Sequence, residues 1–256
     1  MSLFEELLED DKEIVKSFES KPTLCPDIFQ GRKDEYVMRN DIRKKLLEIS
    51  DNFIESFGVE FFIHDVILTG SLSNFNWSEY SDVDLHILID MDEIDGEEKT
   101  NSTSIHTIMK EFFDAKKNIW NEKHNVKVKG FDVEIYVQDV DEEHVSSGVY
   151  SILHNKWVVT PEKSNPNIDD RKIIEKGNEF SKKIDELLKM DDPKEVIEKI
   201  EDLRKKLKKF RQSGLDDGGE YSYENLTFKL LRRNGEIEKL LNLKNSLIDK
   251  KLSITQ

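Results

Sequence analysis

The chain has 256 residues, of which 36% are hydrophobic and 36% charged, and its formal net charge is −15 at pH 7. Leucine, isoleucine, valine and phenylalanine together make up 77 residues, enough for a hydrophobic core, which excludes a disordered chain. No apolar run approaches the ~18 residues that cross a bilayer, so we expect no membrane partner. The acidic first residues and the single cysteine, Cys25, favour the cytoplasm over a secreted, disulfide-bonded fold.

The charges are distributed unevenly along the chain. Residues 1–170 carry 37 acidic and 18 basic side chains, whereas residues 171–211 carry 10 acidic and 14 basic ones. Because the acidic front repels a long phosphate backbone, we expect no long duplex nucleic acid among the partners. Six of the nine residues in the segment 203–211 are basic. This segment is either a solvated helix face or a strip that binds a triphosphate or a nucleic-acid end.

The first part of the chain predicts a helix followed by two strands. Residues 38–57 carry apolar side chains at helical spacing, at Ile42, Leu46, Ile49, Phe53 and Phe57. A strand is predicted over 60–69, just before the turn at Gly70 and Ser71. From Asp82 to Ile89 polar and apolar residues alternate, which predicts a strand whose polar face begins with two aspartates.

The rest of the chain adds one helix, a strand pair and a helical region. Residues 104–122 predict a helix with one apolar side, formed by Ile105, Ile108, Phe112 and Ile119. Polar and apolar residues alternate over 126–128 and 131–137, which predicts two strands. A Pro/Ser/Asn-rich connection follows at 161–166. After it, three helices are predicted, over 169–190, 193–212 and 222–251. We expect an α+β fold with a small mixed sheet and flanking helices in residues 1–161 and a helical C-terminal domain in residues 162–256.

The alternating strand over 82–89 carries the chemistry. Two aspartates at i and i+2 of a strand, Asp82 and Asp84, point to the same side. Nucleotidyl transfer uses two divalent cations bridged by shared carboxylates, and Mg²⁺ prefers oxygen ligands. A third carboxylate on a neighbouring strand can complete the site, a role that fits Glu134, with Asp132 on the same face as the alternative. Three carboxylates therefore predict a site for two Mg²⁺ ions, with Mn²⁺ as a possible substitute.

The turn before this strand supplies phosphate contacts. Glycine at position 70 lets the backbone approach a ligand, and the exposed N–H groups and the Ser71 hydroxyl can bind the β and γ phosphates of a nucleotide. Ser81, next to Asp82, can offer its own N–H or hydroxyl. His86 continues the polar face and is interpreted as a surface histidine of the strand. Gly70, Ser71 and Ser81 are thus the predicted nucleotide-binding residues.

This arrangement resembles the DNA polymerase β-like nucleotidyltransferase superfamily. The resemblance covers about residues 42–138 and rests on a hydrophobic-Gly-Ser turn, the sequence DVDL ten residues later and an alternating strand that bears Glu134. It implies that Gly70 and Ser71 bind the nucleotide phosphates, that Asp82 and Asp84 bind two Mg²⁺ ions, and that Glu134 completes the site. More narrowly, the segments LCPDIF, NWSEYSDVDLHIL and SGVYSILHNKWVVTP resemble a phage-type group of predicted nucleotidyltransferases, which implies the host cytoplasm as the location.

Departures from the family pattern affect the choice of substrate. Minimal nucleotidyltransferases carry Ala-Arg-Gly after the Gly-Ser pair, whereas this chain has Ser73-Asn74-Phe75 and lacks that phosphate-binding arginine. The Gly-Gly and Arg-Asp signatures of CCA-adding enzymes are also absent. Terminal nucleotidyltransferases and cyclic-dinucleotide synthases, which have Gly-Ser with a variable linker, fit at least as well.

The predicted activity is Mg²⁺-dependent transfer of a nucleoside monophosphate from an NTP to an acceptor hydroxyl, with the nucleotide between the two domains and pyrophosphate released. The acceptor stays open between a small molecule, a protein and an RNA 3′ end, the last by template-free addition. Synthesis of oligonucleotides or cyclic nucleotides is a related alternative. A catalytically inactive module that binds a nucleotide is the alternative from another class. It is disfavoured because three neighbouring carboxylates repel one another unless cations bind among them.

Overall fold

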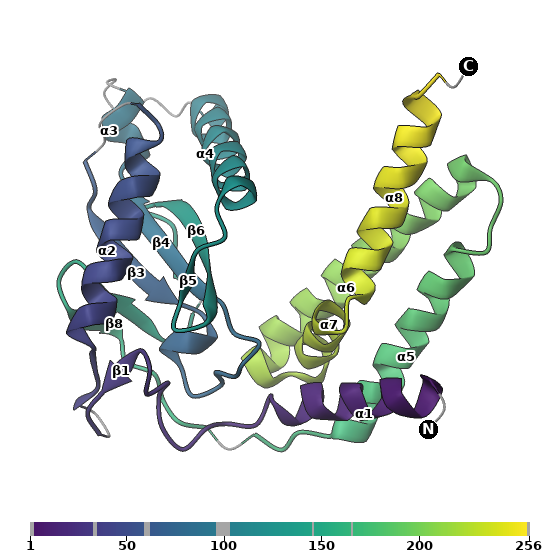
Figure 1. The fold of residues 1–256 in the computed structure, drawn as a ribbon, viewed down its shortest axis with the longest axis horizontal. Helices are drawn as coiled ribbons and strands as arrows, with labels where there is room; N and C mark the ends of the chain where they lie inside the picture. Colours follow the sequence, from purple (N-terminus) through teal and green to yellow (C-terminus); the bar gives the residue numbers. More distant parts are fainter. Residues whose placement is uncertain are drawn as a thin grey trace. The chain divides into compact units, whose positions relative to one another are not determined.

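The computed structural model describes residues 3–32, 35–58, 62–95, 103–144, 146–164 and 166–254. It divides into two compact units (Figure 1). The sheet unit covers residues 20–164, and the helical unit combines residues 1–19 with 165–256. Each unit is described by itself below.

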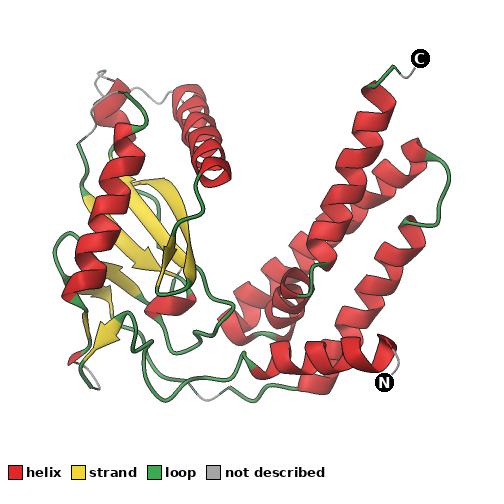
Figure 2. Ribbon diagram, in the orientation of Figure 1, coloured by secondary structure: helices red, strands yellow, loops and turns green. Residues whose placement is uncertain are grey.

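The sheet unit is built on six strands in the order β5-β6-β4-β3-β7-β8, drawn in yellow in Figure 2. Their bounds are β3 Asp65–Thr69, β4 Val83–Ile89, β5 Lys127–Val128, β6 Phe131–Asp139, β7 Val149–Ser151 and β8 Lys156–Val159. β4 pairs with β6 in parallel, and the other neighbouring pairs in this sheet are antiparallel. A separate two-stranded sheet joins β1 (Phe29–Gln30) to β2 (Val37–Met38). The predicted α+β class with a mixed sheet is therefore confirmed.

One face of the sheet is covered by helix α2 (Asn40–Glu55), as predicted from its apolar stripe (Figure 1). The stripe residues Ile42, Leu46, Ile49 and Phe53 are buried and belong to one core cluster with Val83, Leu85 and Ile87 of β4. Because side chains alternate along a strand, Asp84 and His86 point to the opposite face. The packing of α2 thus decides which face of β4 is available for chemistry.

Helix α4 (Thr103–Lys123) follows the short α3 (Met91–Asp95), and it buries a different side from the one predicted. Ile108, Phe112 and Ile119 are 64%, 44% and 48% exposed, whereas Phe113 and Trp120 are buried. The side chain of Ile105 lies outside the described residues. The cause is aromatic packing, because the Trp120 and Phe113 rings contact the Phe53 and Phe57 rings of the α2 region at centroid distances of 5.8 and 5.6 Å.

The helical unit contains α1 (Leu3–Lys16), α5 (Asp170–Leu187), α6 (Pro193–Gly218), α7 (Tyr223–Arg233) and α8 (Glu236–Leu252), with a 3₁₀ turn at Gly219–Tyr221. The third helix predicted over 222–251 is two helices, separated at Gly235, whose φ of 83° ends the helical path. Residues up to Glu19, expected in the first domain, instead pack with the C-terminal helices. Ile14, Val15 and Phe18 share a buried cluster with Ile173, Leu226 and Leu230, which is the reason for this difference. None of the described helices is both long and apolar enough to span a bilayer.

Candidate functional site

The parallel pairing of β4 with β6 aligns two of the predicted carboxylates. Asp84 and Glu134 are register partners on these neighbouring strands, and both side chains are partly buried. Asp82 stands two positions before Asp84 and directly precedes β4, so strand alternation directs it to the same face. The three acids predicted as metal ligands thus belong to one end of the β4–β6 pair.

Asp132, the alternative third acid, lies two residues before Glu134 on β6 and pairs with a lysine. Its register partner is Lys127 of β5, and its carboxylate forms an ion pair with the Lys127 ammonium at 2.7 Å. The Asp132 side chain is 55% exposed. Since two residues along a strand span about 7 Å, Asp132 is displaced by one full side-chain repeat from the level of Asp84. The register therefore favours Glu134.

The turn at Gly70 abuts the carboxylate of Asp84. Thr69, the last residue of β3, pairs with Asp84, so the chain leaves β3 right beside that aspartate. Gly70 has φ 72° and ψ −158°, a conformation essentially restricted to glycine. A Cβ atom added to Gly70 would lie 1.8 Å from Oδ2 of Asp84. The absence of a side chain at position 70 is thus required both by the backbone and by the space that Asp84 occupies.

The residues after Gly70 form a braced turn. The hydroxyls of Ser71 and Ser81 are hydrogen-bonded at 2.7 Å, which joins two of the predicted nucleotide-binding residues. The Ser81 N–H, however, donates to the carbonyl of Ser78, so it is committed to the turn and only the Ser81 hydroxyl faces Ser71. The Ser73 hydroxyl contacts the carbonyl oxygens of Gly70 at 2.9 Å and Gly148 at 2.6 Å. These bonds fix the path of the turn next to Asp84.

Tyr136 is a neighbour of the site that sequence reasoning treated only as part of the alternation. It follows Glu134 by two residues, and its hydroxyl donates a hydrogen bond to Oε2 of Glu134. Burial raises the pKa of the Tyr136 phenol, and the hydrogen bond to Glu134 and the charges of Glu134, Asp84 and Asp82 raise it further. The signal in the sequence was its position at i+2 of an acid on the polar face. Because all three acids act on this one phenol, they share its surroundings.

The Tyr136 ring is itself held in place. It stacks on the His86 ring at a centroid distance of 4.8 Å, and the Lys117 ammonium of α4 lies 4.2 Å from its centroid. His86 is hydrogen-bonded to Oε1 of Gln138 through Nδ1 at 2.9 Å. Burial lowers the pKa of the His86 imidazole, an effect larger than that of the Gln138 hydrogen bond, which raises it. His86 thus supports Tyr136 instead of standing on an open surface as interpreted from the sequence.

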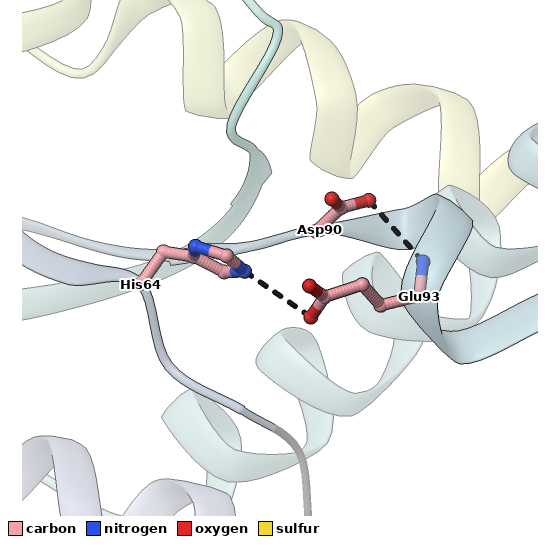
Figure 3. A group of neighbouring side chains, drawn as sticks. All are labelled: His64, Asp90 and Glu93. Atoms are coloured by element: carbon pink, nitrogen blue, oxygen red, sulfur yellow. Dashed lines mark hydrogen bonds and ion pairs between the residues drawn. The ribbon is translucent and has the colours of Figure 1, made fainter.

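A second group of possible ligands lies beyond the other end of β4 (Figure 3). His64, Asp90 and Glu93 place one ligand atom each within 4.8 Å of one another, which in the described part of the chain is the only such group of three. The ligand atoms of Asp82, Asp84 and Glu134 do not all lie within that distance of one another. Asp90 accepts hydrogen bonds from the N–H groups of Asp92 and Glu93, which caps α3, and Nε2 of His64 lies 3.3 Å from Glu93. Local structure thus accounts for all three residues.

The donor chemistry of Asp82, Asp84 and Glu134 fits Mg²⁺. All three provide carboxylate oxygens from two adjacent strands, and Mg²⁺ takes oxygen ligands and retains several waters. The Asp84 carboxylate occupies the space beside Gly70 that a side chain would fill. The residues present can therefore hold the predicted ions beside a turn suited to phosphates.

Comparison with protein-family models and with curated proteins gives no match for this chain. The resemblance to the polymerase β-like superfamily accordingly rests on the residues named above and remains a prediction.

Proposed function

We propose that the protein is a Mg²⁺-dependent nucleotidyltransferase that moves a nucleoside monophosphate from an NTP to an acceptor hydroxyl. One observation carries this proposal. Asp84 is at once the register partner of Glu134 and the immediate neighbour of Gly70. Two carboxylates on neighbouring strands and a glycine turn therefore lie next to one another, an arrangement that supports metal-assisted transfer of a nucleotide.

Each residue has a distinct role in this proposal. Asp82 and Asp84 would hold the two ions, and Glu134 would complete the ligand set. The Gly70 backbone and the Ser71 hydroxyl bind the β and γ phosphates. When bound, Mg²⁺ lowers the pKa of the acceptor hydroxyl and offsets the negative charge on the leaving pyrophosphate.

Tyr136 is a positioning residue in this proposal, because it acts through Glu134, to which its hydroxyl donates a hydrogen bond. Its hydrogen bond holds one oxygen of Glu134 and leaves the other for a ligand. In the reaction the acceptor oxygen loses its proton to water and bonds to the α-phosphorus. The bond from that phosphorus to the bridging oxygen breaks, and pyrophosphate leaves.

To test the proposal, the full chain is incubated with each α-labelled NTP and Mg²⁺ or Mn²⁺, with and without cell extract. Two quantities are measured, the pyrophosphate released and the molecule that carries the label. Transfer of label with pyrophosphate release supports the proposal, and the labelled product identifies the acceptor. Asp84→Asn should abolish release, whereas Asp132→Asn makes the same change of charge outside the site and should retain it. NTP binding without pyrophosphate release under every condition would overturn the proposed activity and favour an inactive nucleotide-binding module.

A further inference from the structure

The basic segment 203–211 lies on α6 and borders a groove of about 430 Å³ within the helical unit. Four of its six cations line the groove, namely Arg204, Lys205, Lys208 and Arg211. The opposite side is apolar and is formed by Phe228 of α7 and by Ile237, Leu240 and Leu241 of α8. The segment is therefore not evenly solvated, since most of its positive charge borders one apolar groove.

The cations form a row along the helix. Arg204, Lys208 and Arg211 follow one another at intervals of four and three residues, which places them on one side of α6. At 1.5 Å per residue the row is about 10 Å long, enough to contact successive phosphates of one strand. Lys206 and Lys209 belong to the same segment but do not line the groove. They provide a matched control on the same helix.

Within the described residues, the ion pairs of these groove-lining cations with acidic side chains lie at the first end of the row, at Arg204 and Lys205. Arg204 and Lys244 both contact Glu201, at 3.1 and 2.5 Å. Arg211 instead contacts neutral groups, because its Nε donates to the Asn225 side chain at 3.2 Å and its guanidinium lies 4.9 Å from the Phe228 ring centroid. No ion pair joins Lys208 to any residue in the described ranges. Positive charge therefore accumulates toward Arg211.

This accumulation has an electrostatic cost around Arg211. Burial lowers the pKa of the Arg211 guanidinium, and the charge of Arg232 on α7 lowers it further. The pKa of the neighbouring Lys229 is lowered to about 8, mainly by burial. The charge of Glu220 raises this pKa, and the charges of Arg233, Arg232 and Arg211 lower it further. Cations that disfavour one another in this way are stabilised when an anion binds among them.

We propose that the groove binds a single-stranded nucleic acid, with phosphates along its four lining cations Arg204, Lys205, Lys208 and Arg211 and a base against Phe228. An aromatic ring beside a row of cations suits an unstacked base with its phosphates, and single strands present such bases whereas duplexes do not. The volume is within the range of sites for nucleotide-sized ligands. Binding requires none of the carboxylates in the sheet unit, so the inference goes beyond the proposed reaction and can be tested without it.

The experiment measures fluorescence anisotropy of a labelled oligoadenylate of about eight nucleotides with the full chain, in EDTA and over a range of salt concentrations. Replacing Lys205 and Lys208 by glutamate should weaken binding at low salt. It should also reduce the slope of log K against log salt by about 1.4, because each lost phosphate contact on a single strand contributes about 0.7. The matched variant Lys206→Glu with Lys209→Glu has the same net charge and should keep the slope of the unmodified protein.

A second variant tests the base contact. Phe228→Leu retains an apolar side chain but removes the aromatic face, so it should weaken binding about fivefold or more with an unchanged salt slope. Duplex of the same sequence and free ATP serve as competitors, and both should displace the strand less well than unlabelled oligoadenylate. The proposal would be overturned if the Lys205/Lys208 and Lys206/Lys209 double variants lost equal affinity for the strand. It would also be overturned if ATP displaced the labelled strand at concentrations similar to those of unlabelled oligoadenylate. Because binding is measured in EDTA, and Asp84→Asn should not change it, its failure is distinct from a failure of the proposed transfer reaction.

Discussion

The Asp84 carboxylate occupies the space where a side chain at position 70 would lie, which leads to a quantitative prediction for Gly70→Ala. The backbone at φ 72° and ψ −158° disfavours alanine by about 1–3 kcal/mol. The new Cβ would also lie 1.8 Å from Oδ2 and 2.8 Å from Cγ of Asp84, so that side chain must leave its rotamer at a cost of about 1 kcal/mol. We therefore expect the free energy of unfolding to fall by about 2–4 kcal/mol.

Tryptophan fluorescence in urea is a suitable assay for this loss of stability. All three tryptophans, Trp77, Trp120 and Trp157, belong to the sheet unit, so their emission reports the unfolding of that unit. Gly58→Ala is the control, because Gly58 has φ 71° in the same unit and open space around its Cβ position. Gly58→Ala should cost only the backbone strain, about 1–2 kcal/mol.

A double-mutant cycle separates the contact from the strain. In an Asp84→Ala background the carboxylate is gone, so Gly70→Ala should cost about 1 kcal/mol less than in the unmodified protein. The same displacement of Asp84 should slow nucleotide transfer by about 10²-fold, because a catalytic group shifted by about 1 Å loses its alignment. An interaction energy of zero in the cycle would show that position 70 does not constrain Asp84, and the link between turn and carboxylate would be wrong.

Other variants test the acids and the helical unit. Asp82→Asn and Asp84→Asn should each abolish pyrophosphate release without lowering the free energy of unfolding, because each removes repulsion among neighbouring carboxylates; full activity in either would exclude that residue from the site. Glu134→Gln should slow single-turnover transfer by about 10²-fold or more while Asp132→Asn changes it little, and the reverse order would exchange their roles. Lys229→Met should raise the free energy of unfolding at pH 7 by about 1–3 kcal/mol, because the folded-state pKa of about 8 lies below the ordinary 10.5 and the charged lysine disfavours folding. This difference should decline as the pH rises from 8 to 10.5, and a constant difference in urea melts followed by circular dichroism would contradict the pKa shift.

The sequence predicted the helix and strands around the site because each has one clear periodicity. Helix α2 offers a single apolar stripe, and it buries that stripe. Helix α4 offers two, one through Ile108, Phe112 and Ile119 and another through Phe113 and Trp120. Periodicity cannot choose between them, and the ring contacts of Trp120 and Phe113 with the aromatic residues of the α2 region accompany the side that is buried.

The choice between Glu134 and Asp132 depended on information that no local pattern contains. Alternation directs both side chains to one face, so it leaves both as candidates for the third ligand. The register between β4 and β6, two strands about fifty residues apart in the chain, aligns Glu134 with Asp84. The β5 hairpin then gives Asp132 a lysine partner. The hydrogen bond from the Ser81 N–H to the Ser78 carbonyl could not be predicted from the sequence either, because it depends on the path of the turn.

The mixed pairing of the central strand explains why the site forms at the start of β4. An antiparallel neighbour places its last residue beside the first residues of β4, and β3 thereby brings Thr69 and the Gly70 turn to Asp84. A parallel neighbour places its own first residues beside the first residues of β4. The parallel strand β6 thereby brings Glu134 next to Asp84. If both neighbours were antiparallel, the early residues of β6 would lie at the far end of β4, near Asp90. One parallel pair in an otherwise antiparallel sheet is therefore sufficient to bring the Gly70 turn and the Glu134 carboxylate next to Asp84.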